Sequence, residues 1–162
     1  MTTPDEVRWL TADQLRAWVG LLSVAELLPA ALDSQLRRDA GLTHFDYQVL
    51  AMLSEAPGRS LRMTTLAQRT SATLPRLSHV VERLEGRGFV VRTPDPDDAR
   101  ATRAYLAEPG WDTLVAAAPG HVVNARALVI DALTDEQVSQ LESITGALLA
   151  RLDPEDRLAR RG

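Results

Sequence analysis

Apolar positions repeat with helical spacing along most of this chain. The clearest example is the segment 73–85, where four apolar residues recur at i, i+3, i+4 and i+7. They are Leu77, Val80, Val81 and Leu84. This spacing places them on one side of a helix, facing a core. Thr73 suits the N-cap, and Pro75 is tolerated in the first turn because the N–H it lacks would be unpaired there anyway. We therefore predict a helix that begins after Thr73.

The segments around this helix predict the rest of a small module. A short helix is expected over 61–69, although residues 61–63 could instead form a short strand. The glycine-bracketed turn 86–88 follows the second helix, and strand-forming residues then occupy 89–92 and 101–106. A polar, proline-punctuated tip over 93–100 separates the two strands. Helix, turn, helix and hairpin in this order are typical of a winged helix-turn-helix, which reads DNA.

Long helical patterns flank the module on both sides. Capping boxes at Thr11 and Thr134 predict the starts of the first and last helices, and Thr43 is expected to cap a second helix. Pro29 should kink or split the first helix, and Pro119 should bend or divide the helical pattern over 111–133. We expect a mostly α protein with a small β wing, flanked by long N- and C-terminal helices.

The flanking helices carry more apolar residues than a small winged helix needs to cover. We therefore expect them to pack against their copies in a homodimer with two-fold symmetry. The alternative is a monomer that folds these helices onto itself.

Candidate contact residues lie on the polar face of the 73–85 helix. Arg76 is near its N-terminus, where a recognition helix contacts base edges, and an arginine there can bind guanine in a bidentate fork. Ser78 and His79 could contact bases or phosphates, and Arg83 is better placed for phosphate. The same residues could also form an ordinary solvated face, because many amphipathic helices look like this.

The hairpin supplies a second group of candidates. Asp98 precedes Arg100 by two residues, so its carboxylate could brace the guanidinium in a fixed direction. A projecting arginine suits the negative potential of a narrow minor groove. We place Arg103, on the following strand, in the same DNA-binding set. The alternative for these residues is a surface ion pair, worth about 0–1 kcal/mol.

Three stretches resemble the MarR family of bacterial transcriptional regulators: 65–69, 77–85 and, above all, Asp95-Pro-Asp-Asp-Ala-Arg over 95–100. The resemblance implies one MarR-like domain over 1–162, with dimerisation helices at 11–40 and 108–153 and a winged-helix DNA-binding lobe at 43–107. It implies that Arg100 enters the minor groove with Asp98 as its brace. It also implies that a small aromatic or phenolic ligand can bind between the dimer helices and the lobe.

Charge and composition narrow the function. The chain has a formal net charge of −4, yet residues 61–106 carry eight arginines against five acids, while the remainder carries ten against 17. A basic reading head on an acidic body is compatible with DNA binding. The absence of cysteine excludes a disulfide framework, a thiolate zinc site and a cysteine redox sensor.

Other function classes find little support. The three histidines, His44, His79 and His121, have no metal-ligand spacing, and neither a nucleophile elbow nor a phosphate-binding glycine loop occurs. We expect no enzyme activity, no cofactor and no metal. The start of the chain lacks the basic and apolar segments of a signal peptide, and no window has about 18 apolar residues. We therefore expect a cytoplasmic protein without membrane contact.

These patterns predict a sequence-specific regulator that binds double-stranded DNA. We expect a homodimeric repressor on a palindromic operator. The alternative is a dimeric ligand-sensing or protein-docking module that does not read DNA.

Overall fold

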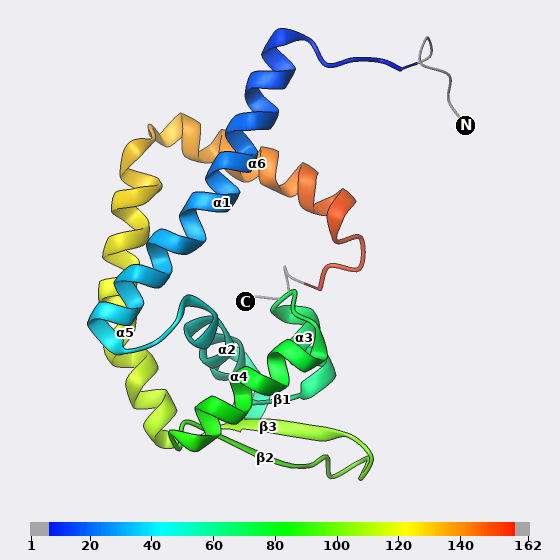
Figure 1. The fold of residues 1–162 in the computed structure, drawn as a ribbon, viewed down its shortest axis with the longest axis vertical. Helices are drawn as coiled ribbons and strands as arrows, with labels where there is room; N and C mark the ends of the chain where they lie inside the picture. The colour runs from blue at the N-terminus through cyan, green and yellow to red at the C-terminus, as the bar shows by residue number, and fades with distance from the viewer. Residues whose placement is uncertain (1–6, 158–162) are drawn as a thin grey trace.

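The computed structural model describes residues 7–157. It contains long helices around a small three-stranded sheet (Figure 1). Along the chain the elements are α1 (Ala12–Ala40), α2 (His44–Glu55), the 3-10 helix η2 (Pro57–Arg59), β1 (Ser60–Arg62), α3 (Met63–Arg69), α4 (Leu74–Gly86), β2 (Val90–Pro94), β3 (Thr102–Leu106), α5 (Glu108–Leu128), the 3-10 helix η3 (Ile130–Ala132) and α6 (Asp135–Leu152). The predicted fold class, mostly α with a small β wing between long terminal helices, is confirmed.

The helix-turn-helix and the wing form one lobe, which lies at the bottom of Figure 1. The sheet is antiparallel in the order β1-β3-β2, so the short strand before α3 completes the wing sheet. In this register Leu61 lies opposite Ala104, Arg62 opposite Arg103 and Val90 opposite Leu106. The expected helix over 61–69 is shorter than predicted, because its first two residues pair with β3.

The hydrophobic core lies almost entirely within this lobe. All four residues of the predicted α4 stripe are buried. They pack with apolar residues of α2, α3 and the sheet, and fully buried examples are Leu50, Leu53, Leu66 and Val90. The lobe joins α5 closely, since a Cβ on Gly110 would lie 2.3 Å from the carbonyl oxygen of Phe89. Only glycine therefore fits at position 110, in the first turn of α5.

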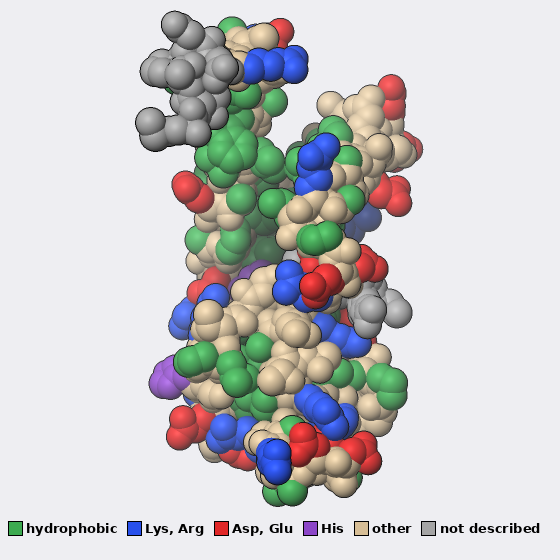
Figure 2. Space-filling model, turned by 90° about the vertical axis from the view of Figure 1, so that its right-hand side faces the viewer, with side chains coloured by type: hydrophobic (Ala, Val, Ile, Leu, Met, Phe, Trp, Pro, Cys, Tyr) green, Lys and Arg blue, Asp and Glu red, His purple; other side chains and the backbone are tan. Residues whose placement is uncertain are grey.

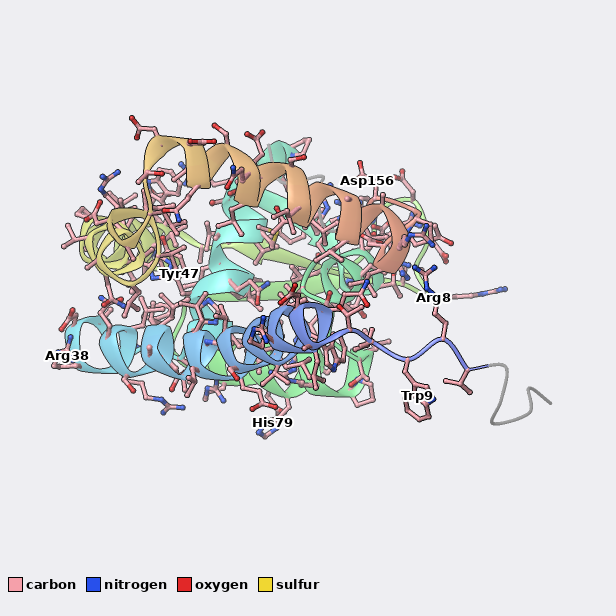
Figure 3. All side chains as sticks on the ribbon, turned by 90° about the horizontal axis from the view of Figure 1, so that it is seen from above. Arg8, Trp9, Arg38, Tyr47, His79 and Asp156 are labelled. Atoms are coloured by element: carbon pink, nitrogen blue, oxygen red, sulfur yellow. The ribbon has the colours of Figure 1, made fainter. Side chains whose placement is uncertain are left out.

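The terminal helices form an open frame above the lobe. α1 and α5 pack side by side, whereas α6 follows the upper end of α5 and lies apart from α1 when seen from above (Figures 1 and 3). Their apolar residues are largely uncovered: α6 has no buried residue, and the only buried residues of α1 are Gln35 and Leu36. Figure 2 shows hydrophobic side chains on the two arms above the lobe.

Helix boundaries follow the predicted caps, and neither Pro29 nor Pro119 divides its helix. Thr11, Thr43 and Thr134 each form the expected capping box. Pro29 and Pro119 lie inside helices that continue through them, so the alternative of a divided helix is wrong at both positions. A proline removes one intrahelical hydrogen bond, and these two prolines are exposed, where water can satisfy the freed carbonyl groups. The helical segment ends instead at Val129, with φ −126° and ψ −63°.

Two helical segments, Ala12–Ala40 and Glu108–Ala132, are long and apolar enough to cross a membrane by length and composition. Their most apolar windows are 6% and 11% buried within the chain. The sequence criterion of about 18 apolar residues did not detect them because polar and charged residues interrupt both segments. Two such helices are weak evidence for a membrane span, since an apolar helix that packs against another protein has the same composition.

Candidate nucleic-acid interface

Helix α4 separates an apolar face from a polar face. The apolar face is buried in the lobe, while Arg76, His79 and Arg83 are exposed and Ser78 is half-buried. Thr73 caps the helix as predicted, and its Oγ1 accepts a hydrogen bond from the backbone N–H of Arg76 at 3.4 Å. The side chain of His79 points outward from the body (Figure 3). The first turns of α4 therefore present polar groups to the surroundings.

Three arginines connect α4 to the corner between α1 and α2. The guanidinium of Arg76 lies 4.4 Å from the ring centre of Phe45. Arg83 forms an ion pair with the buried carboxylate of Asp46. Arg87 donates a hydrogen bond of 2.9 Å to the carbonyl oxygen of Gly41. Asp46 also accepts from the N–H of Thr43 in the capping box, so the start of α2 and the recognition helix share one carboxylate.

These contacts distinguish the predicted residues of α4. Arg83 is bound within the lobe, and its guanidinium is not a freely projecting cation as the sequence suggested. Arg76 keeps its charge exposed, but stacking on Phe45 restricts its direction. Among residues 7–157, Ser78 and His79 make no side-chain hydrogen bond or ion pair, so they present unpaired polar groups.

The wing loop is closed by its own backbone. Asp95 donates its N–H to the carbonyl oxygen of Ala101 at 2.8 Å, and Ala101 donates to the carbonyl oxygen of Asp98 at 2.9 Å. Asp98 does not bond to the guanidinium of Arg100, as the spacing had suggested. Its Oδ1 instead accepts the backbone N–H of Arg100 at 3.1 Å. Within the described part of the chain the guanidinium of Arg100 has no partner, and its side chain is exposed.

A buried carboxylate at the base of the wing holds the two arginines that face each other across β1 and β3. Arg62 binds Asp95 through two hydrogen bonds of 3.0 and 2.9 Å, and Arg103 adds one of 2.8 Å. The Asp95 side chain is 0% exposed. The hydrogen bonds from Arg62 contribute most to holding the pKa of Asp95 far below its ordinary value, although burial opposes this effect.

This network changes the interpretation of Arg103. The sequence placed Arg103 among the DNA-binding residues, but its guanidinium is committed to Asp95 and to Ser60 Oγ, at 3.3 Å. Sequence reasoning did not identify Asp95 or Arg62 as site residues. The available signal was the position of Asp95 at the start of the same acidic motif that carries Arg100.

The recognition helix and the wing meet at one hollow of about 220 Å³. Leu74 and Ser78 line it from α4, Arg100 and Thr102 line it from the wing, and Thr64 lines it from α3. Ser78, one of the α4 residues predicted to contact DNA, and Arg100, the arginine predicted to enter the minor groove, therefore line the same hollow of the lobe.

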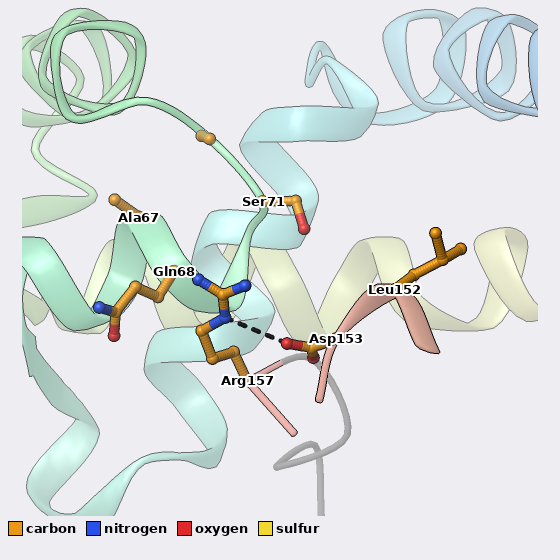
Figure 4. Close-up of a pocket in the computed structure, with 7 residues that line it drawn as sticks. Ala67, Gln68, Ser71, Leu152, Asp153 and Arg157 are labelled. Atoms are coloured by element: carbon orange, nitrogen blue, oxygen red, sulfur yellow. Dashed lines mark hydrogen bonds and ion pairs between the residues drawn. The ribbon is translucent and has the colours of Figure 1, made fainter. Parts of the chain in front are cut away.

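Two further hollows of the described chain, near α3 and the segment after α6, contain none of the predicted contact residues. A hollow of about 340 Å³ lies between α3 and the segment after α6, beside the Arg157–Asp153 ion pair of 3.1 Å (Figure 4). Within residues 7–157, no group of three or more His, Cys, Asp and Glu side chains could hold a metal ion.

Comparison with known proteins agrees with this geometry. A sequence model of the MarR family matches residues 40–101, which span the lobe up to the tip of the wing. Sco3205 of Streptomyces coelicolor, a MarR family transcriptional regulator solved in complex with DNA, is 44% identical. The match covers 94% of this chain and 95% of that one, with a TM-score of 0.88.

Two further relatives support the same assignment. AbsC of Streptomyces coelicolor, another MarR family transcriptional regulator, is 36% identical with a TM-score of 0.84, over 90% of this chain and 98% of that one. The HTH-type transcriptional repressor YetL of Bacillus subtilis (strain 168) is 24% identical over 143 residues, which are 88% of this chain and 84% of YetL. The chain therefore belongs to the MarR family of DNA-binding transcriptional regulators.

Proposed function

We propose that this regulator is a homodimeric repressor that occupies a palindromic operator. Its recognition helix α4 enters the major groove, and the wing enters the neighbouring minor groove. The observation that carries this proposal is the common hollow of α4 and the wing, where Ser78 and Arg100 line the same space. A duplex placed against this side meets both elements at once.

Within this proposal the predicted contact residues fall into two groups: those whose side chains are available to DNA and those whose side chains are bound within the lobe. Arg100 is the minor-groove contact, because its guanidinium is unpaired and exposed in the described structure. Arg76, Ser78 and His79 are the major-groove candidates, and the stacking of Arg76 on Phe45 orders it before DNA arrives. Arg83, Arg103 and Asp98 act mainly through the shape of the lobe and the wing.

The exposed apolar residues of the terminal helices support the dimer. On α1 they include Leu15, Trp18, Val19, Leu22 and Leu27, and on α6 they include Leu141, Ile144, Leu148 and Leu152. A second copy that covers these helices would remove a large apolar area from water, which favours association. Two lobes related by a two-fold axis would then reach successive major grooves, about 34 Å apart. The proposed dimer is a cytoplasmic protein whose apolar helices face the partner and not a bilayer.

We further propose that a small aromatic or phenolic effector binds this regulator and changes its affinity for the operator. A protein of the same fold, the organohalide-sensing regulator RdhR-CbdbA1625, is known in a form bound to 2,4-dichlorophenol; it is 23% identical to this chain. Here an apolar hollow of about 200 Å³ lies between α1 and the end of α5, lined by Val24, Leu27, Leu28, Ala31, Leu128 and Val129. A ligand that binds one spacing of the two lobes better than another would change operator affinity by that difference.

The experiment is equilibrium binding to a duplex that the protein selects from a random library, measured across a salt series. Specific binding should yield a palindromic site, and the affinity should fall with a log-log slope of about 0.9 per phosphate contact. Sedimentation of the free protein measures the dimer in parallel. If a dimeric protein selects no sequence, the alternative of a ligand-sensing or docking module that does not read DNA is favoured.

A further inference from the structure

The base of the wing contains an electrostatic conflict that one residue resolves. Arg62 and Arg103 are directly opposite each other on the antiparallel strands β1 and β3. Like charges at directly opposed positions destabilise a strand pair. The carboxylate of Asp95 binds both guanidinium groups and is inaccessible to solvent. Without this carboxylate, two positive charges would face each other at the root of the wing.

Asp95 also shapes the loop that follows it. Its Oδ1 accepts the N–H of Asp97 at 3.0 Å, and its backbone N–H bonds to the carbonyl oxygen of Ala101. One residue therefore contacts β1, β3 and both ends of the tip. Arg100 lies inside this closed loop, one residue before Ala101. The direction in which Arg100 leaves the lobe depends on how the loop is fastened.

We propose that Asp95 is the positioning residue for Arg100. By holding Arg62 and Arg103 together and closing the loop over 95–101, it fixes the wing arginine in the direction needed for the minor groove. Asp95 itself does not contact DNA. The inference rests on the proposed DNA-reading function and assigns to Asp95 the bracing role that the spacing alone had suggested for Asp98.

The direction in which Asp95→Asn changes DNA affinity distinguishes a positioning role from a purely electrostatic one. Asp95→Asn makes the lobe one unit more positive, which alone should strengthen binding to a polyanion. Positioning predicts the opposite, a loss of about tenfold or more, because ordered charge-assisted hydrogen bonds are replaced by weaker neutral ones. Asp97→Asn is the matched control, since Asp97 is exposed in the same loop and changes the charge equally. It should leave affinity unchanged or slightly higher.

A double-mutant cycle identifies the residue through which Asp95 acts. Wild type, Asp95→Asn, Arg100→Ala and the double variant are titrated against the duplex selected by the wild type. If Asp95 acts through Arg100, the double variant binds within about twofold to threefold of Arg100→Ala, because coupled residues are not additive. Losses that multiply would overturn the proposal, as would tighter binding by Asp95→Asn.

Hydrogen exchange on the free, full-length variant provides a readout that does not need DNA. Amides of residues 95–101 should exchange faster in Asp95→Asn, while amides of the α4 core keep their protection. Unchanged exchange in the wing, or a general loss of protection, would contradict the positioning role. If wild type selects no duplex, the proposed function fails together with this inference; if wild type binds but the cycle is additive, only the inference fails.

Discussion

Arg62 and Arg103 lie directly opposite each other across β1 and β3, and both bind the carboxylate of Asp95. Two cations and one buried anion thus join the strand before α3 to the strand after the wing tip. The lobe needs positive charge on the side that faces DNA, but the charges of Arg62 and Arg103 are instead paired with Asp95 inside the lobe. The free cations of this region are therefore fewer than the eight arginines of residues 61–106 suggest.

This network predicts a specific pH dependence of stability. The pKa of Asp95 is lowered in the folded protein, so its contribution is present above the unfolded value of about 4 and is lost as the pH falls below it. Urea unfolding of wild type and Asp95→Asn should show a difference that is constant near neutral pH and narrows below about pH 4. If the difference in stability between wild type and Asp95→Asn widened at low pH, the pKa of Asp95 would not be lowered in the folded protein.

Removing Arg100 should weaken binding to every sequence, because the minor-groove contact reads groove shape and potential more than base identity. For Arg100→Ala we expect a loss of about 1.5–3 kcal/mol, the range of a hydrogen bond to a charged group. The melting temperature should stay near that of the wild type, since the guanidinium makes no hydrogen bond or ion pair within residues 7–157. Equal losses on selected and unrelated duplexes would support this role, and unchanged affinity would refute it.

Arg76 should control base preference. Arg76→Ala is expected to relax the preference at one or two base pairs per half-site, by about 1–3 kcal/mol. Phe45→Leu removes the ring on which the guanidinium rests but keeps the charge, so it should reduce discrimination less. Selection from a random library measures both. A recognition sequence that is identical for all three proteins would exclude Arg76 as a base-reading residue.

The Arg83–Asp46 pair should affect stability more than DNA affinity. Asp46 is buried, but Arg83 is 44% exposed, so solvent weakens the pair. Arg83→Gln is expected to lower the free energy of unfolding by about 1 kcal/mol. Arg69→Gln removes a positive charge from the same lobe without breaking a side-chain contact of the described structure and serves as control. A larger affinity loss for Arg83→Gln than for Arg100→Ala would restore Arg83 as a principal DNA contact.

His121 lies where α5 meets α2, 4.4 Å between ring centres from Tyr47. Burial lowers its pKa, and the nearby His44 lowers it further. An unfolded histidine binds its proton near pH 6.5, so the folded state should lose stability as the pH falls below about 6.5. His121→Asn should flatten this part of the stability profile. Equal profiles for wild type and His121→Asn would contradict the prediction.

The proposed dimer can be tested on α6. Ile144→Glu places a charge on the exposed apolar stripe, where Ile144 is 57% exposed in the single chain. We expect this variant to shift toward monomer in sedimentation experiments, because a buried unpaired charge is costly. Ser143→Glu adds the same charge on the side of α6 opposite this stripe, where Ser143 is exposed, and should leave the dimer intact. A wild-type protein that is monomeric at all concentrations would exclude the dimer.

Local rules predicted the helix boundaries well and the side-chain partners poorly. A capping box at Thr11, Thr43 or Thr134 needs only four neighbouring residues, so the sequence contains all the information. Pro29 and Pro119 do not divide their helices as the sequence had allowed, because the long helical segments on both sides compensate for one missing hydrogen bond.

The partners of the arginines depend on tertiary packing. Asp95 binds an arginine 33 residues away, and Arg83 binds an aspartate 37 residues away. No local spacing encodes these pairs, so the sequence assigned Arg83 and Arg103 to DNA contacts and did not predict their carboxylate partners. The Asp98-Ala-Arg100 spacing did predict an interaction, but the carboxylate binds the backbone N–H and not the guanidinium.

The most direct measurement is the structure of the protein bound to the duplex it selects. We predict α4 in a major groove, with Arg76 toward base edges, and the Arg100 guanidinium inside the adjoining minor groove of the same half-site. Asp95 should still hold Arg62 and Arg103 in the complex. A complex in which the duplex contacts another side of the lobe, or in which Arg100 lies away from the minor groove, would contradict it.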